Sequence, residues 1–125
     1  MTPLGFQRQW RWFRAPGSER VIAREEFEAL PLHGRAALAD VMKRWASGGH
    51  VLPREVKKLK GSGDLWELRV NVGNDPFRLV FFQDSPVHDV IVLAVYKNQK
   101  KLPTSDLERA KQRRDVWRAH GRGVR

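Results

Sequence analysis

Three charged residues on two neighbouring apolar segments are the strongest candidates for chemistry in this 125-residue chain. Glu67 and Arg69 share one face of the segment 65–72 if it is extended, because side chains two apart in a strand point the same way. Arg78 interrupts the segment 77–82, which is otherwise apolar. Two arginine forks on a concave sheet could hold a phosphate and stabilise the negative charge that develops on it.

The same residues allow a purely structural interpretation. Glu67 would form an ion pair with Arg78 across a hairpin and so satisfy a half-buried guanidinium. The sequence leaves both interpretations open. Within the functional one, we assign Glu67 an orienting role, because a carboxylate flanked by two arginines holds a proton too weakly to serve as a general base at neutral pH.

A second candidate group follows the apolar segment 89–95, where the chain runs into an aromatic residue and several lysines. A tyrosine that stacks on a base, beside lysines that hold phosphates, is typical of an RNA-binding edge. The alternative is that Tyr96 caps the core while the lysines are solvated. Together with the densest lysine run, at 57–60, the predicted RNA-binding residues are Lys57, Lys58, Lys60, Tyr96, Lys100 and Lys101.

Charge and composition narrow the function further. The 24 Lys and Arg residues against 14 Asp and Glu residues leave a net charge of +10, which favours a polyanionic partner. Segment 97–125 holds ten of the basic and three of the acidic residues, and we expect it to form one basic face with the lysines of 57–60. The absence of cysteine excludes disulfides and thiolate metal sites, and the four histidines lack ligand spacing, so we expect neither a metal nor another cofactor.

The elements that must position these residues follow from apolar periodicity. It predicts strands near 8–14, 65–72, 77–83 and 89–97, and helices over 23–30, around 38–45 and over 105–119. Ser105 and Glu108 have the spacing of a capping box that would begin the last helix. We therefore predict an α+β fold, in which N-terminal helices pack on an antiparallel sheet of about four strands and a C-terminal helix follows.

The chain is short enough for one domain, which we place at 1–119, followed by a flexible basic tail at 120–125. Its longest apolar run, 90–96, is too short to span a membrane, and the first residues lack the basic-then-apolar pattern of a signal peptide. We expect a cytoplasmic protein without membrane contact.

As a set, four motifs resemble the RelE/ParE toxin superfamily, and in particular its HigB-like, phage-related branch of type II toxin–antitoxin systems. The motifs are L-K-G at 59–61, E-L-R at 67–69, F-R-L-V-F-F at 77–82 and Y-K-N-Q-K-K-L-P at 96–103, followed by a basic helix. The resemblance extends over residues 8–118 and implies a small α+β domain with two N-terminal helices on an antiparallel sheet.

The resemblance also implies roles for individual residues. Arg78 matches the strand arginine that stabilises the scissile phosphate in the family, and Arg69 lies where a second basic strand residue is found. Lys60 matches the basic residue of the L-K-G motif, while Lys97 and Lys100 lie in the strand-end region where relatives place further active-site groups. The expected catalytic residues are Arg78, Arg69, Lys97 and Glu67.

By this resemblance the chain is expected to be a toxin that cleaves mRNA as a ribosome-dependent, metal-independent endoribonuclease, with the RNA's own 2′-hydroxyl attacking the adjacent phosphate. The expected partners are mRNA, the ribosome and a HigA-like helix-turn-helix antitoxin, through which the complex would bind operator DNA. Two alternatives remain open: a ParE-like, non-enzymatic inhibitor of DNA gyrase, and an inactive member that binds only its antitoxin and operator DNA. They share one scaffold, so the fold cannot decide among them.

Overall fold

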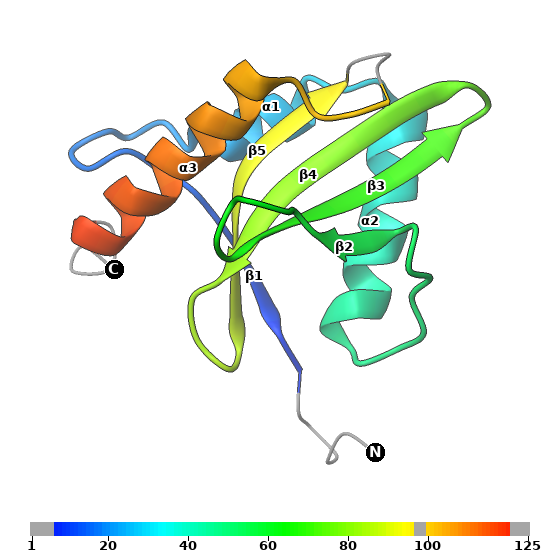
Figure 1. The fold of residues 1–125 in the computed structure, drawn as a ribbon, viewed down its shortest axis with the longest axis horizontal. Coiled ribbons are helices and arrows are strands. Elements are labelled where there is room, and N and C mark those ends of the chain that lie inside the picture. Colours follow the sequence, from blue (N-terminus) through cyan, green and yellow to red (C-terminus); the bar gives the residue numbers. More distant parts are fainter. Residues whose placement is uncertain (1–6, 97–99, 121–125) are drawn as a thin grey trace.

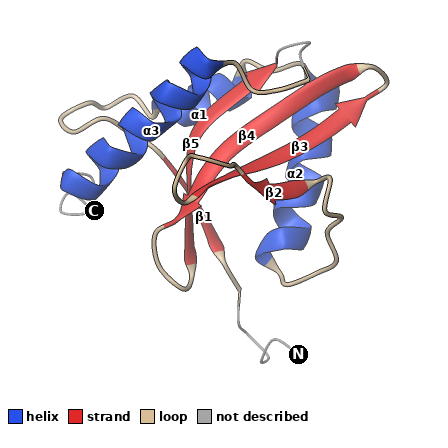
Figure 2. Cartoon of the chain, in the orientation of Figure 1, coloured by secondary structure: helices blue, strands red, loops and turns tan. Residues whose placement is uncertain are grey.

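The computed structural model describes residues 7–96 and 100–120, which form three helices and a five-stranded sheet (Figures 1 and 2). In chain order the elements are β1 (Gln9–Trp12), α1 (Ile22–Glu28), α2 (Leu32–Ala46), β2 (Val56–Lys58), β3 (Leu65–Val72), β4 (Asp75–Gln83), β5 (His88–Tyr96) and α3 (Thr104–Ala119). The predicted α+β class, with two N-terminal helices and a C-terminal helix, is confirmed. Within the described part of the chain, no helix is both long and apolar enough to cross a lipid bilayer.

The strand order is β1-β5-β4-β3-β2, so the sheet has one strand more than the sequence predicted. β2 to β5 pair antiparallel, as expected, but β1 runs parallel to β5 because two helices separate it from the rest of the sheet. Arg8 fixes this edge: its guanidinium donates two hydrogen bonds of 2.7 Å to the buried carboxylate of Asp89. A charge-assisted, bidentate pair of this kind sets the register of a short strand that periodicity alone does not place.

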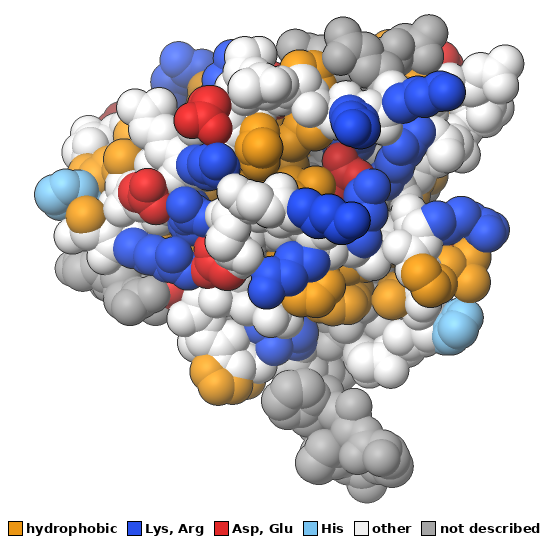
Figure 3. Space-filling model, in the orientation of Figure 1, with side chains coloured by type: hydrophobic (Ala, Val, Ile, Leu, Met, Phe, Trp, Pro, Cys, Tyr) orange, Lys and Arg blue, Asp and Glu red, His pale blue; other side chains and the backbone are white. Residues whose placement is uncertain are grey.

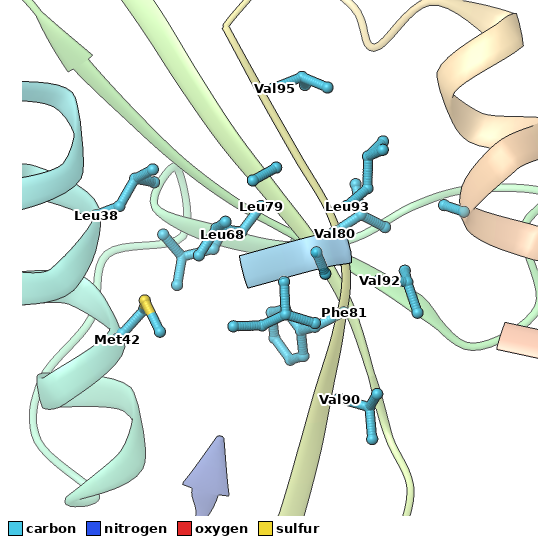
Figure 4. Packing of buried hydrophobic residues seen from close by; sticks show 14 of the residues in the cluster. Leu38, Met42, Leu68, Leu79, Val80, Phe81, Val90, Val92, Leu93 and Val95 are labelled. Carbon is cyan, nitrogen blue, oxygen red and sulfur yellow. The ribbon is translucent and has the colours of Figure 1, made fainter. Parts of the chain in front are cut away.

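The core includes buried residues from all three helices as well as the sheet, and its α2 side follows from the sequence pattern. The i, i+3, i+4 spacing of Leu38, Val41 and Met42 buries one face of α2, as predicted, and Figure 4 shows Leu38 and Met42 directed toward Leu68 and Phe81 of the sheet. The end of α2 is also as predicted. Gly48 follows it with a φ of 76°, and the N–H of Gly49 donates to the carbonyl of Arg44, which closes a Schellman motif.

The predicted capping box of the last helix is wrong. α3 begins at Thr104, directly after Pro103, so Ser105 lies inside the first turn and no side chain caps the helix. The carbonyl of Pro103 accepts the backbone N–H groups of Asp106 and Leu107. The helix starts early because proline, with a φ of −56° and no N–H to leave unpaired, is well suited to precede a first turn.

α1 and α3 together close the free edge of β5. β1 pairs only with His88–Ile91, which leaves the rest of that edge uncovered. There Glu26 of α1 accepts the N–H of Ala94 at 3.3 Å, and Arg113 of α3 donates to the carbonyl of Val92 at 2.8 Å. Glu26 and Arg113 also form an ion pair of 2.9 Å. The two helices therefore satisfy backbone groups that a longer β1 would have paired.

Candidate nucleic-acid interface

The register of three strands places four charged residues side by side. Lys57 of β2 lies directly opposite Glu67 of β3, and Arg69 of β3 lies directly opposite Arg78 of β4. These side chains point away from α2, because the alternate residue Phe77 packs against α2, with its ring 5.4 Å from that of His33. All four therefore occupy the sheet face on which α3 lies.

Arg78 is the largest of the fully buried side chains. Its Nε lies 3.2 Å from Oε2 of Glu67, which is itself buried, so the ion pair predicted as one of two possibilities is present. Burial lowers the pKa of Arg78 from its ordinary value, while the negative charges of Glu67 and Asp106 oppose that shift. A guanidinium stays protonated under such a shift, so Arg78 is a buried cation that pairs with Glu67 and is stabilised by the charge of Asp106.

Arg69 is only partly buried and faces outward from the same cluster. Two arginines directly opposite on paired strands repel each other, and the neighbouring carboxylates offset this repulsion. One terminal nitrogen of Arg69 donates to the carbonyl of Lys100 at 3.1 Å. Its Nε has no hydrogen-bond partner among the described residues. Arg69 thus links β3 to the segment that leads into α3 and retains an unused donor.

Five predicted RNA-binding residues surround one hollow on this face, which we call the lysine hollow. It has a volume of about 450 Å³, and Lys57, Lys58, Lys60, Lys100 and Lys101 line it together with Glu67, Leu59, Leu102 and Leu107. Lys and Arg side chains gather there over β2, β3 and the connection into α3 (Figure 3). Of these five lysines, Lys57 approaches the carboxylate of Glu67, at 3.9 Å. The structure therefore brings together lysines that are far apart in the sequence.

The sixth predicted RNA-binding residue, Tyr96, lies elsewhere. Its ring stacks on that of Phe77 at 4.7 Å, on the sheet face that α2 covers, and its hydroxyl donates to Asp75 at 2.8 Å. This hydrogen bond, together with partial burial, raises the pKa of Tyr96. Tyr96 and the lysine hollow are on opposite faces, because Phe77 and Arg78 alternate along β4. Lys97, predicted as catalytic, lies outside the described residues.

Sequence reasoning missed Asp106, which is fully buried in the first turn of α3 and acts electrostatically on Arg78. The sequence carried no clear signal for it, because the first turn of α3 and β4 are far apart in the chain and approach each other only in the folded protein. The apparent capping box at 105–108 concealed it, because that interpretation gave the segment a purely local role.

The basic residues of α3 do not extend the lysine hollow, so the expected single basic face is wrong for them. We call Arg113, Arg114 and Arg118 the α3 arginines. Arg113 pairs with Glu26, while Arg114 and Arg118 both pair with Asp64 in the turn before β3. Arg118 also lies over the ring of Phe82 at 4.9 Å. Their charges bind the helix to the sheet instead of facing a ligand.

No group of three or more His, Asp or Glu side chains that could hold a metal ion occurs in residues 7–96 and 100–120. The cation-rich lining of the lysine hollow suits an anion. With the buried Glu67 and five exposed lysines in its lining and the partly exposed Arg69 beside it, the arrangement can bind phosphates and neutralise charge that builds up on one.

Comparison with known proteins gives a consistent picture. Residues 25–115 match the family described as phage derived protein Gp49-like. Two curated relatives, from two strains of Mycobacterium tuberculosis and each called "Probable endoribonuclease HigB1", are 37% identical over 109 residues, which is 87% of this chain and 84% of the relative. The family match includes β2 to β5 and most of α3, and therefore every described residue of the lysine hollow.

Proposed function

This chain belongs to the Gp49-like family, in the HigB-like branch of the RelE/ParE superfamily, and from that premise we propose that it is a toxin of a type II toxin–antitoxin system that cleaves mRNA as an endoribonuclease. The observation that carries the proposal is the lysine hollow, which five lysines line together with Glu67, the ion-pair partner of the buried Arg78. Charge of this density and sign fits the phosphate backbone of RNA.

In the proposed reaction the 2′-oxygen of the RNA attacks the neighbouring phosphorus and the 5′-oxygen leaves. The substrate supplies its own nucleophile, so the protein must align the strand, transfer protons and neutralise the charge of the crowded phosphate. We assign alignment to the lysines and charge neutralisation to the partly exposed guanidinium of Arg69. Lys97 is proposed as a further active-site group on the basis of the family resemblance.

Arg78 receives a different part in this proposal. Its complete burial and its pairing with Glu67 favour a positioning role, in which it holds the carboxylate that faces Lys57. Glu67 then acts as the orienting group that we assigned from the sequence. We further propose that the protein cleaves mRNA without a metal, on the ribosome and in the cytoplasm. A HigA-like antitoxin would neutralise it, and the toxin–antitoxin complex would bind operator DNA.

The test is to express the wild type and a Lys60→Gln/Lys101→Gln variant in a bacterial host and map mRNA 5′ ends by primer extension. Both lysines are exposed and neither forms an ion pair within the described residues, so the variant should fold normally. We expect new 5′ ends inside reading frames with the wild type and about tenfold fewer with the variant, since two phosphate contacts are lost. Lys43→Gln, which removes an exposed lysine from α2, is the matched control and should cleave like the wild type.

DNA supercoiling, followed in the same cultures, separates the alternatives. Growth arrest with intact mRNA and altered supercoiling would place the protein with ParE-like gyrase inhibitors. An absence of arrest would indicate a member that only binds its antitoxin. Equal cleavage by the double variant and the wild type would show that the lysine hollow has no part in cleavage.

A further inference from the structure

A second polar hollow lies beside the lysine hollow, at the edge of the sheet. It has a volume of about 580 Å³ and opens between α2, the connection into β2 and the second half of β3. We call it the β3-edge hollow. Its lining residues are Ala37, Asp40, Val41, Arg44, Arg54, Glu55, Lys57, Arg69, Val70 and Asn71.

The hollow exists because β2 is too short to cover β3. β2 pairs only with Trp66–Leu68, and the N–H of Arg69 donates to the carbonyl of Glu55 at 2.8 Å as the last backbone contact on this side. Backbone groups two residues apart along a strand point to the same edge, so the N–H of Asn71 also faces the hollow. An uncovered strand edge of this kind supplies donors to whatever binds there.

The charges of the lining favour an anion. Arg44 is engaged by Glu55 at 2.9 Å and by Asp40 at 3.0 Å, so these three side chains together carry one net negative charge. Arg54 is exposed and forms no ion pair within the described part of the chain. Together with Lys57 and Arg69, it leaves a positive excess at the mouth of the hollow.

The two hollows form one basic path around the edge strand. Lys57 lines both of them, and Arg69 lines the β3-edge hollow while hydrogen-bonding to Lys100, which lines the lysine hollow. In Figure 3, blue side chains continue from the centre of this face to its right-hand side, where Figure 1 shows the connection between α2 and β2. A polyanion bound in the lysine hollow can therefore continue past β2 over a lining in which cations outnumber acids.

We propose that the β3-edge hollow is a second RNA subsite, which binds the sugar–phosphate backbone of the single-stranded segment on one side of the cleaved bond. Arg54 contacts a flanking phosphate, and Asn71 offers hydrogen bonds to the sugar or the base. This inference rests on the proposed endoribonuclease function. It adds Arg54 as a residue that increases the length of RNA in contact with the protein.

RNA fits this hollow better than an acidic peptide does. The apolar lining consists of Ala37, Val41 and Val70, which are small and offer no pocket for the large anchor side chains that dominate peptide recognition. A phosphate backbone needs only spaced cations and donors, which the hollow supplies.

The experiment measures the affinity of the protein for a fluorescent, fully 2′-O-methylated RNA oligonucleotide, which cannot be cleaved because its nucleophile is blocked. Dissociation constants are determined over a series of salt concentrations for the wild type, Arg54→Gln and Arg54→Lys. Each lost phosphate contact lowers the salt slope for single strands by about 0.7, which amounts to about a fivefold difference in affinity over a tenfold range of salt. We expect this loss in Arg54→Gln and recovery in Arg54→Lys.

Lys43→Gln is the control, since it removes one exposed positive charge from α2 at a position that lines neither hollow. An Arg54→Gln slope equal to that of the wild type, in a protein that still cleaves mRNA, would overturn the subsite and leave the proposed function standing. Wild-type protein that neither binds this oligonucleotide nor cleaves mRNA would overturn both. Unchanged RNA binding with weakened binding of the antitoxin would assign the hollow to the protein partner and overturn the subsite.

Discussion

The lysines of the lysine hollow and the α3 arginines carry charge of the same sign, but they use it differently. Each α3 arginine pairs with a carboxylate, at Glu26 or Asp64, and ties the helix to the sheet. In the lysine hollow only Lys57 approaches an acid, at the long distance of 3.9 Å. One region uses its charge to hold the fold, and the other presents it to solvent.

The difference teaches that net charge does not locate a binding surface. Arginine's planar fork matches carboxylates and carbonyls, so it serves well in partly buried structural pairs. Lysine is a flexible, strongly hydrated point charge that remains available at a rim. Although the segment after residue 96 is the most basic in the sequence, the basic residues of its described part that line the lysine hollow are Lys100 and Lys101.

The largest expected effect comes from removing the acid beneath the lysine hollow. Glu67→Gln removes the carboxylate that pairs with the buried Arg78, and we expect a loss of about 3 kcal/mol in the free energy of unfolding. Thermal unfolding should then begin about 10 °C lower. If Glu67→Gln abolished cleavage while leaving stability unchanged, the orienting role would be wrong and direct participation in the reaction would replace it.

A smaller effect is expected from the α3 arginines. Arg113→Ala removes hydrogen bonds to Glu26 and to the carbonyl of Val92, both partly buried, and should cost about 2 kcal/mol of stability. Lys111→Ala, which breaks only a surface pair with Glu108, should stay within about 0.5 kcal/mol.

Urea unfolding of these variants, with Lys60→Gln beside them, tests the comparison. Lys60→Gln should also stay within about 0.5 kcal/mol of the wild type. A loss for Lys60→Gln as large as that for Arg113→Ala would mean that the lysine hollow is structural as well.

The Arg44–Glu55 pair gives the smallest effect and refines the comparison, because its arginine is paired yet open to solvent. Hydrogen bonds from Arg44 and from the N–H of Leu52 lower the pKa of Glu55 from 4.5 to about 2. A depressed carboxylate pKa stabilises the fold above the unfolded value and loses that contribution as pH falls toward the folded value. We therefore expect about 1 kcal/mol to be lost as the pH falls below about 4.5, a contribution that solvent screening keeps small.

Glu55→Gln provides the comparison for this pH dependence. Its stability should fall less than that of the wild type between about pH 5 and about pH 2 when both are measured by urea unfolding. Parallel curves for the two proteins would show that the Arg44–Glu55 pair contributes nothing to acid stability.

Much of the candidate site was predictable because it is local. Glu67 and Arg69 share a face through the period of a single strand, and Arg78 reaches Glu67 across a two-strand hairpin with a short turn. The lysines at 57–60 and 100–101 could be named from their density, although nothing in the sequence brought the two groups to one hollow. Asp106 and the isolation of Tyr96 could not be found in this way, because they depend on how α3 and α2 dock on opposite faces.

By itself, the sequence determined the strands from β3 to β5, the amphipathic face of α2 with its glycine end, and the motifs that place the chain in its family. These follow from side-chain periodicity and turn chemistry, which act over a few residues. Only the tertiary structure decided that β1 joins β5 in parallel, that Arg78 is fully buried between two acids, and which cations remain available to a ligand. Those outcomes depend on pairings between segments that are distant in the sequence. The free energy needed to bury a charge is offset only by ion pairs that form once the helices pack on the sheet.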